Sequence, residues 1–371
     1  MDALARAVGF TAAGMAAVPE PESVEDQAER ARFADWIEAG RAGEMEYLRR
    51  RDEAGLLLRS SVRVVFPWAR SVIVCAANYH ADQPRSIDPA PADAGWIARY
   101  AWTGRDSAED SRPTDYHKVL RRRLEVLRAA VGEETGEFES RCFVDTGPVV
   151  ERVYARYAGL GWTGKNTCLL NQELGSWLFL GVIVTSLELP AGQRGAALAP
   201  DRCGSCTRCL DACPTGALTG PRQMDASLCI SYLTIEKRGE IPEALRSDMG
   251  RQVFGCDICQ DVCPWNRRAP IAADAELAPR TALVNPALEW LGAMGEADFE
   301  RWFNGSPVRR AKYSGFRRNV AIAMGNSGQA RFAATLENWA NDADPVLAET
   351  ARWAIRKLKA PRRPEPQHPE P

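Results

Sequence analysis

The sequence predicts an α+β protein built in three parts, and three observations carry this prediction. Over residues 1 to 190, apolar β-branched runs alternate with helical periodicity, as in an α/β or α+β domain. Eight of the eleven cysteines lie between Cys203 and Cys263, in a loop-rich segment flanked by prolines. Beyond Pro286 the periodicity is helical again. We therefore expect an N-terminal α/β domain over 1–195, a cysteine-rich domain over 196–275, a helical region over 276–360 and a disordered tail over 361–371.

The N-terminal part alternates helical and strand patterns. Residues 1 to about 60 carry helical spacing, for example at Phe33, Trp36 and Ile37. Residues 71–79 are apolar and β-branched, as expected of a buried strand, and the Pro- and Asp-rich residues 81–94 predict a loop. Further along, we expect an amphipathic helix over 116–130 with arginines on its outer face, a strand end at 143–145, a helix starting near Val149 and a second clear strand over 177–189.

The C-terminal part shows two similar helical patterns, at residues 316–325 and 347–358. Both place small and aliphatic residues on one face and arginines on the other. Their spacing of about thirty residues suits a short stack of HEAT-like helix pairs, with an ordinary helical subdomain as the alternative. From Arg301 to Arg363 the chain has thirteen Lys and Arg against four Asp and Glu, although the whole chain carries a net charge of only −2. This local excess favours a polyanionic partner.

Composition excludes several classes of protein. The longest apolar run, residues 177–187, is too short and too broken by glycine to cross a membrane. The first residues lack the charged and apolar regions of a secretory signal, so we expect a cytoplasmic protein. In that compartment a disulfide framework is not expected, and metal ligation explains the cysteines better.

The cysteines form two related sets. Residues 203–214 read Cys-x2-Cys-x2-Cys-x3-Cys-Pro, and the second set has Cys-x2-Cys-x3-Cys-Pro over 256–264 with its first ligand moved upstream to Cys229. Bacterial ferredoxins use this spacing for two 4Fe–4S clusters, each triple being completed by the fourth cysteine of the other set. A structural zinc ribbon does not use this triple spacing. We predict one cluster on Cys203, Cys206, Cys209 and Cys263, and the other on Cys213, Cys229, Cys256 and Cys259.

Other sequence motifs are few. There is no G-x-G-x-x-G after a strand and no P-loop, so neither a dinucleotide nor a nucleoside triphosphate site is indicated. Asp115-Tyr-His117 falls short of the D-x-H-x-x-G motif of some cobalamin enzymes because Leu120 replaces the glycine, and we do not expect His117 to ligate cobalt. Three isolated cysteines on apolar segments are expected to be packing residues: Cys75, Cys142 and Cys168.

Longer blocks of sequence resemble epoxyqueuosine reductases. They include Phe143-Val-Asp145-Thr-Gly-Pro-Val-Val-Glu151-Arg152 and Ala158-Gly-Leu-Gly-Trp-Thr-Gly-Lys165-Asn166. The resemblance continues through 170–181, through 229–236 after the first cysteine set, and through 255–266, so it covers nearly the whole chain.

This resemblance implies an oxidoreductase of queuosine biosynthesis. Members of the family reduce epoxyqueuosine to queuosine at the wobble position of tRNA, with cobalamin bound in the N-terminal domain beside two 4Fe–4S clusters. The implied partners are a tRNA carrying epoxyqueuosine and an unidentified low-potential electron donor. We expect a monomer that does not bind a membrane.

The resemblance also assigns a proton donor. Removing the epoxide oxygen as water consumes two electrons and two protons, and the leaving oxygen needs a proton in the transition state. Asp145 matches the proton donor of the family, and this role predicts a pKa raised by a desolvated pocket.

Further site residues follow from the same comparison. Four are expected to hold cobalamin or the substrate: Arg152, Lys165, Asn166 and Ser176. Five from the basic C-terminal region are proposed contacts to tRNA phosphates: Arg309, Arg310, Lys312, Arg317 and Arg318.

The chain departs from the family pattern at residues 107–115, an acidic insertion that puts local contacts in doubt. Two rival interpretations remain open on the sequence alone. One is a cobalamin and iron–sulfur reductase of a small molecule, similar to reductive dehalogenases. The other is an iron–sulfur electron-transfer protein without reductase chemistry of its own.

Overall fold

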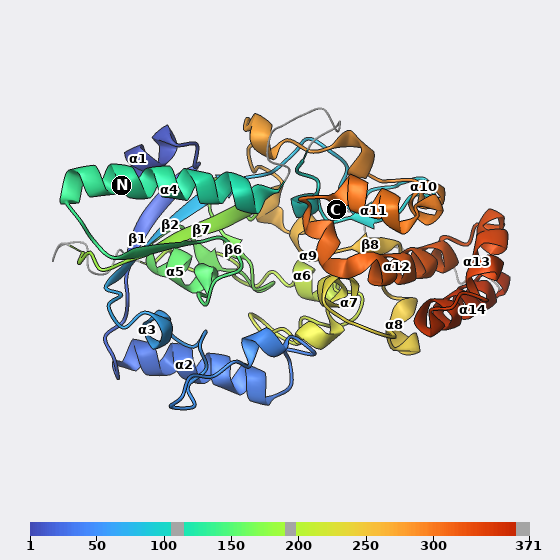
Figure 1. Ribbon diagram of the computed structural model, residues 1–371, viewed down its shortest axis with the longest axis horizontal. Helices are drawn as coiled ribbons and strands as arrows, with labels where there is room; N and C mark the ends of the chain where they lie inside the picture. Colours follow the sequence, from blue (N-terminus) through green and yellow to red (C-terminus); the bar gives the residue numbers. More distant parts are fainter. Residues whose placement is uncertain (105–114, 190–197, 361–371) are drawn as a thin grey trace.

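The computed structural model describes residues 1–104, 115–189 and 198–360. A sheet with its covering helices forms one half of the molecule, and a bundle of helices forms the other, with the cysteine-rich segment between them (Figure 1). The expected disordered tail, 361–371, and all but Asp115 of the insertion lie outside the described residues. No helix in the described part of the chain is long and apolar enough to cross a membrane.

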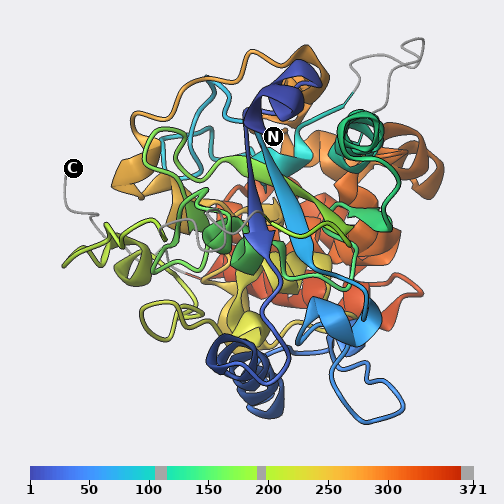
Figure 2. The same ribbon diagram turned by 90° about the vertical axis from the view of Figure 1, so that its left-hand side faces the viewer.

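A four-stranded antiparallel sheet in the order β1-β2-β7-β4 organises the first half (Figure 2). The two strands expected from apolar runs are confirmed as β2, Ser71–Asn78, and β7, Leu178–Thr185, and they pair along their whole length. The short strand expected before Asp145 is β4, Ser140–Phe143. Because all pairings in this sheet are antiparallel, the half is of the α+β type.

Strand β1, Ala12–Ala17, contradicts the expectation of helical structure throughout residues 1–60. Its residues, Ala-Ala-Gly-Met-Ala-Ala, include none of the β-branched types that signal a strand. Packing explains them, because a Cβ on Gly14 would lie 2.4 Å from the carbonyl oxygen of Ala158, just after helix α5, Glu151–Tyr157. The close approach of that helix therefore selects small side chains on this strand.

Helices cover both faces of the sheet, which explains the continuous apolar run of β2. Ile73 and Cys75 face a cluster that includes helices α1, Asp2–Ala7, and α4, Tyr116–Thr135. Val72 and Val74 face the cluster on the other side, beneath α3, Val62–Val65, and α5, Glu151–Tyr157. A strand buried on both faces shows no polar alternation.

Helix α4 begins at the expected residue and ends five residues later than expected. Most of its arginines face outward as predicted, but Arg123 does not: its side chain is 8% exposed. Arg123 donates to Asp274 at 2.6 Å and to Glu276 at 2.8 Å, so it joins the helix to the segment after the cysteines.

The remaining elements before the C-terminal helices lie outside the four-stranded sheet. Helix α2, Val24–Glu38, precedes the sheet segment β2. The cysteine-rich segment holds short helices α6, Arg208–Asp211, α7, Ile230–Ile235, α8, Glu243–Arg246, and α9, Ile258–Asp261. Two-stranded pairs join β3, Trp96–Ile97, to β8, Gln252–Phe254, and β5, Trp162–Thr163, to β6, Leu169–Leu170.

The C-terminal helices pack on one another, as the sequence predicts. They are α10, Leu288–Ala293, α11, Glu296–Phe303, α12, Lys312–Ser327, α13, Ala333–Trp339, and α14, Pro345–Lys359. A Cβ on Gly325 of α12 would lie 2.8 Å from the Cα atom of Ala354, so these two helices touch backbone to backbone.

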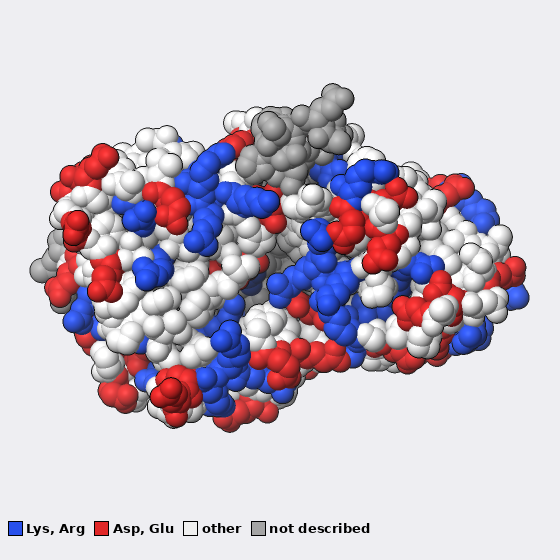
Figure 3. Space-filling view, viewed as in Figure 1, with Lys and Arg blue, Asp and Glu red and all other residues white. Residues whose placement is uncertain are grey.

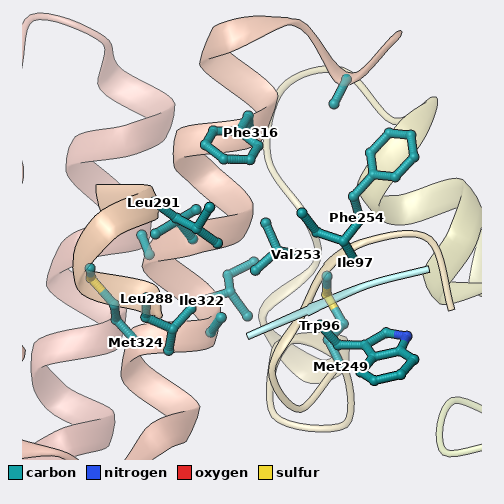
Figure 4. Packing of buried hydrophobic residues seen from close by; sticks show 14 of the residues in the cluster. Trp96, Ile97, Met249, Val253, Phe254, Leu288, Leu291, Phe316, Ile322 and Met324 are labelled. Carbon is teal, nitrogen blue, oxygen red and sulfur yellow. The ribbon is translucent and has the colours of Figure 1, made fainter. Parts of the chain in front are cut away.

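One cluster of buried side chains runs from Trp96 through Phe254 to Ala354. Figure 4 shows part of it, with Ile97 and Val253 beside Phe316 and Ile322 of α12. This core extends across both expected domain boundaries, near residues 195 and 275. The β3–β8 pair and the C-terminal helices therefore share one hydrophobic core.

Candidate active site

A cavity of about 960 Å³ lies where the two halves meet. Strand β7 contributes Phe179, the start of α5 contributes Glu151 and Arg152, and the cysteine-rich segment contributes Cys229 and Cys256. A space-filling view shows the molecule hollowed in its middle, with Lys and Arg side chains around the hollow (Figure 3). A cavity of this size is large enough for a bulky organic cofactor.

A smaller cavity of about 430 Å³ adjoins the first and shares part of its wall, including Tyr116, Asp145 and Arg310. Its other walls bring in His117 and two cations of α4, Lys118 and Arg121. Asp145 therefore stands at the junction of the two cavities.

Asp145 lies two residues beyond the end of β4, on the segment that leads into α5. Its backbone is in the left-handed region, with φ of 58°. Aspartate tolerates this conformation better than most residues do, although it is still strained, and such strain gathers at functional sites. The side chain is 68% exposed because it faces the open cavity.

Two side chains from the start of α4 contact Asp145. The hydroxyl of Tyr116 donates to its Oδ2 at 3.2 Å, and Nε2 of His117 lies 3.6 Å from the same oxygen. On the other side of the ring, Nδ1 of His117 lies 2.6 Å from Oδ1 of Asp115. Asp115 also caps the helix by accepting from the backbone N–H of His117.

These contacts correct the expected titration of Asp145. The interaction with His117 holds the pKa of Asp145 below its usual value and outweighs desolvation in the cavity, which acts in the opposite direction. Burial lowers the pKa of His117, but the contact with Asp115 and the nearby Asp145 carboxylate raise that pKa to about 9. At neutral pH the proton therefore resides on His117, and Asp145 is a carboxylate.

Glu151 is a second acid in the large cavity, and sequence reasoning gave it no role. Burial raises the pKa of Glu151 to about 7, and the nearby Asp145 carboxylate adds to the rise. Its Oε1 atom is buried and has no hydrogen-bond partner among the described residues. An unpartnered carboxyl in a cavity wall is suited to a polar ligand group.

The eight cysteines have the following neighbours among themselves. Cys203 packs with Cys263 in a small cluster under Trp162, and Cys263 also interacts electrostatically with Cys209. Cys206 interacts in the same way with Cys209. In the other group, Cys256 interacts with Cys213 and Cys229, and Cys259 with Cys229 and Cys256.

These neighbours are compatible with the predicted donor sets of two 4Fe–4S clusters, in which each triple is completed by a cysteine of the other sequence set. No three His, Cys, Asp or Glu side chains in the described ranges converge closely enough to ligate a single metal ion. Cys229 and Cys256, both of the second group, line the large cavity.

The three remaining cysteines differ in their surroundings. Cys75 and Cys142 are buried in the core beneath α4, as expected of packing residues. Cys168 instead lies against Cys259, one of the predicted cluster ligands, and next to Arg152. Because these residues are far apart in the sequence, their spacing gave no sign of this contact.

Of the four residues expected to hold the cofactor, the structure places only Arg152 in the wall of the large cavity. Its Nη1 donates to the carbonyl of Thr167 at 3.1 Å. The others hold the backbone around the cysteines: Lys165 donates to the carbonyl of Gly204 at 2.7 Å, Asn166 donates to that of Cys259 at 3.1 Å, and Ser176 hydrogen-bonds Asn266.

The five cations expected to contact tRNA are in different environments. Arg318 is a correction: it is 2% exposed and donates to the carbonyls of Leu233, Lys237 and Gly239, so it cannot reach a phosphate. Arg317 is 20% exposed and pairs with Asp342 at 2.8 Å.

The other three predicted cations are more accessible. Arg309 is 47% exposed and pairs with Glu300, and Lys312 is exposed. Arg310 pairs with Glu236 and lines both cavities. The helical spacing of these cations did not predict that Arg318 is buried. The cysteine-rich segment, which packs against α12, covers its side chain.

Two family models match the chain. Residues 202–266 match a 4Fe–4S double cluster binding domain, and residues 59–146 match the epoxyqueuosine reductase QueG model, DUF1730. The first match spans all eight clustered cysteines.

Known proteins resemble the chain along most of its length. The epoxyqueuosine reductase of Gloeobacter violaceus is 42% identical over 332 residues, which are 87% of this chain and 94% of that protein. A crystal structure of an epoxyqueuosine reductase with an epoxyqueuosine-modified tRNA-Tyr stem loop covers 95% of this chain and 88% of its own, at 27% identity and a TM-score of 0.80.

A second similar structure is that of the Bacillus subtilis enzyme with its catalytic aspartate loop swung out of the active site. It has the same identity, coverage and TM-score as the complex with the stem loop.

Proposed function

The chain belongs to the epoxyqueuosine reductase family, and from that premise we propose that it reduces epoxyqueuosine to queuosine at the wobble position of tRNA. We further propose that two 4Fe–4S clusters transfer electrons to a cobalamin bound in the large cavity. The observation that carries it is the cavity itself, with predicted cluster ligands Cys229 and Cys256 in one wall and Asp145 in another.

The residues of the large cavity suit cobalamin, a bulky cofactor that carries several amide side chains. Glu151 and Arg152 would hold those polar groups, since a carboxyl with an unpartnered oxygen and a guanidinium both face the cavity. Phe179 and Tyr100 offer apolar surface. When bound there, cobalamin supplies a reducing metal centre that can hold more than the single electron a cubane transfers.

Cluster ligation is proposed in the crossed arrangement: Cys203, Cys206, Cys209 and Cys263 for the first cluster, and Cys213, Cys229, Cys256 and Cys259 for the second. Because Cys229 and Cys256 line the cavity, the second cluster would lie beside the cofactor. Lys165 and Asn166 would then position the cluster segments by binding their carbonyls.

Asp145 is proposed to pass a proton to the epoxide oxygen. Its Oδ2 faces the junction of the cavities, where a nucleoside entering through the smaller one would meet the cofactor. The similar Bacillus subtilis structure, which has a catalytic aspartate loop, supports a catalytic role for an aspartate on this loop.

The tRNA would approach over the smaller cavity, whose wall includes Lys118, Arg121 and Arg310. Cations neutralise phosphates and position the nucleic acid without reading its bases. Arg309 and Lys312 remain proposed contacts to tRNA phosphates. The further proposals are a low-potential electron donor as partner and a monomer working in the cytoplasm.

A single-turnover assay tests this function. Anaerobically reconstituted protein, with and without cobalamin, is mixed with a strong reductant and epoxyqueuosine-containing tRNA, and the nucleosides are analysed by mass spectrometry. We expect queuosine only when cobalamin is present. Persistent epoxyqueuosine, with clusters intact and cobalamin bound, would leave a small-molecule reductase as the better interpretation.

A further inference from the structure

Three side chains stand in a row at the start of α4 and on the loop after β4. Oδ1 of Asp115 lies 2.6 Å from Nδ1 of His117, and Nε2 of His117 lies 3.6 Å from Oδ2 of Asp145. We propose that His117, held by Asp115, reloads Asp145 with protons, so that this proton relay delivers both protons that the reduction consumes. The inference rests on the proposed function and names residues of the same site.

The stoichiometry of the reaction requires more than one proton. When an epoxide becomes an alkene, both C–O bonds break, a second C–C bond forms, and the oxygen leaves as water. Two electrons from a low-potential one-electron donor and two protons balance this change. A carboxyl group such as that of Asp145 carries one proton at most, so a single acid must be recharged within each turnover.

The two relay residues connect the two cavities, so a proton can pass from the smaller cavity through His117 to Asp145. His117 lines the smaller cavity, where its side chain is 26% exposed, whereas Asp145 lines both. Protons from water can therefore reach the imidazole from one side and leave through the carboxylate towards the other. At 3.6 Å the gap between Nε2 and Oδ2 is slightly longer than a hydrogen bond, so a small shift of the Asp145 loop would close it.

Asp115 fixes the ring for this task. It accepts from the backbone N–H of His117 at 2.9 Å and from Nδ1 with the same oxygen. Tyr116 stacks on the imidazole, with ring centroids 4.0 Å apart. With Nδ1–H directed at Asp115, the second proton of the imidazolium sits on Nε2, the atom that faces Asp145.

Charges around the relay favour a proton on His117. Carboxylates Asp115 and Asp145 face the ring from opposite sides, and Lys118, Arg121 and Arg310 line the same small cavity with the opposite effect. The carboxylates dominate, because the pKa of His117 is raised to about 9. Tyr116 is no substitute as a donor, since burial raises its pKa well above the usual value.

Glu151 is the rival source of the second proton, because it faces the large cavity and its pKa is raised to about 7. The two sources differ in where activity is lost as the pH rises. A supply through His117 persists towards pH 9, whereas a supply through Glu151 fails above pH 7. The pH dependence of turnover therefore distinguishes them.

The test measures single-turnover conversion of epoxyqueuosine in tRNA from about pH 5.5 to about pH 9.5. For the wild-type holoenzyme we expect a rate that falls only near pH 9. In His117→Gln the falling limb moves towards acid, with near-normal turnover at the acidic end and a loss of about 10²-fold at pH 8. In Asp115→Asn the rate should fall at a pH between those of the wild type and of His117→Gln.

Matched variants and spectra keep the result interpretable. Glu151→Gln is compared by its pH profile alone, because Glu151 is a proposed cobalamin contact: whatever its rate, its activity should fall at the same pH as that of the wild type. Absorbance of the clusters and of bound cobalamin shows whether each variant is folded and loaded. A His117→Gln profile that coincides with the wild type, or a shift produced by Glu151→Gln instead, would overturn the relay. A wild-type enzyme that is loaded yet converts no epoxyqueuosine would remove the proposed function and the relay together.

A second readout needs no turnover. The chain has three histidines, so ¹⁵N-histidine NMR of the oxidised holoprotein gives few ring signals, and the one missing from His117→Gln is identified directly. We expect this ring to titrate near pH 9, and at a lower pH in Asp115→Asn. Titration of His117 at or below its ordinary pH of about 6.5 would contradict the relay even if the enzyme is active.

Discussion

At the scale of single residues, Asp145 combines a strained backbone with an exposed carboxylate. Its φ of 58° is a conformation that asparagine also tolerates, and its side chain is 68% exposed. A side chain that faces an open cavity contributes little to folding, so this residue separates function from stability unusually well.

Asp145→Asn should therefore abolish turnover while leaving the protein folded. We expect a loss of about 10² to 10⁴-fold in the single-turnover rate, since general acids contribute on this scale. The free energy of unfolding should change by no more than about 0.5 kcal/mol. Rates are measured on epoxyqueuosine-containing tRNA and stability by circular dichroism. Normal turnover of the variant would show that another group protonates the oxygen.

Glu151 makes stability depend on pH in the opposite sense from most carboxylates. Its pKa in the folded protein, about 7, lies above the ordinary glutamate value of 4.5, so ionisation opposes folding. The unfavourable contribution is absent below pH 4.5, grows as the pH rises and is complete above pH 7.

Glu151→Gln should therefore stabilise the cobalamin-free protein at alkaline pH. We expect a gain on the order of 1 to 3 kcal/mol at pH 8, since a tenfold change in an ionisation equilibrium corresponds to about 1.4 kcal/mol, and a gain that vanishes towards pH 4.5. Denaturation curves at several pH values measure it. Glu173→Gln, at an exposed position, is the control and should show no such dependence. A gain that is the same at all pH values would point to packing instead.

Sequence spacing gives specific predictions for single residues only where the spacing itself defines the chemistry. The cysteine sets indicated two ligand groups because thiols three residues apart wrap one cluster. Asp145 was found by resemblance, but its partners were not, because Asp115 and His117 lie about thirty residues away and meet it only through the fold. Arg318 was misassigned for a similar reason: the segment that buries it is not its neighbour in the chain.

At the scale of elements, α4 supports the site at its first turn and is held near its middle. Arg123 donates to Asp274, to Glu276 and to the carbonyl of Gly9 at 2.8 Å, with its side chain 8% exposed. Arg122 pairs with Glu276 at 2.7 Å as well, but it is 52% exposed. The two arginines thus share a partner and differ in burial.

Arg123→Ala should destabilise the protein far more than Arg122→Ala. Removing the buried cation leaves carboxylates without their partner and should cost about 3 kcal/mol, whereas the exposed pair is worth less than about 1 kcal/mol. Melting temperatures of the anaerobic holoproteins measure the difference. Equal losses would mean that Asp274 and Glu276 remain hydrated without Arg123 and that the helix does not depend on this contact.

Helices and strands were predicted correctly from the sequence where burial gives them a clear pattern of apolar residues. Strands β2 and β7 lie in the middle of the sheet and read as apolar runs, so their positions were correct. Strand β1 was not predicted, because contact between Gly14 and the end of α5 requires small residues, which do not indicate a strand. The helices α12 and α14 were visible because the faces they bury are continuous.

At the scale of the whole molecule, the two halves place the predicted clusters at different distances from the cavity. Cys229 and Cys256 line the large cavity, whereas Cys206 is in the wall of neither cavity. The second cluster would thus form part of the cofactor site, and the first would serve only to bring electrons to it. Single ligand substitutions can separate these roles.

Cys229→Ala and Cys206→Ala should each halve the iron content, from about eight to about four atoms per chain, and each should stop turnover. Only Cys229→Ala is expected to weaken cobalamin binding, by roughly tenfold or about 1.4 kcal/mol, because it removes a wall of the cavity. Iron analysis and cobalamin titration followed by absorbance measure both effects. If Cys206→Ala instead lost the cofactor while Cys229→Ala retained it, the placement of cobalamin beside Cys229 and Cys256 would be wrong.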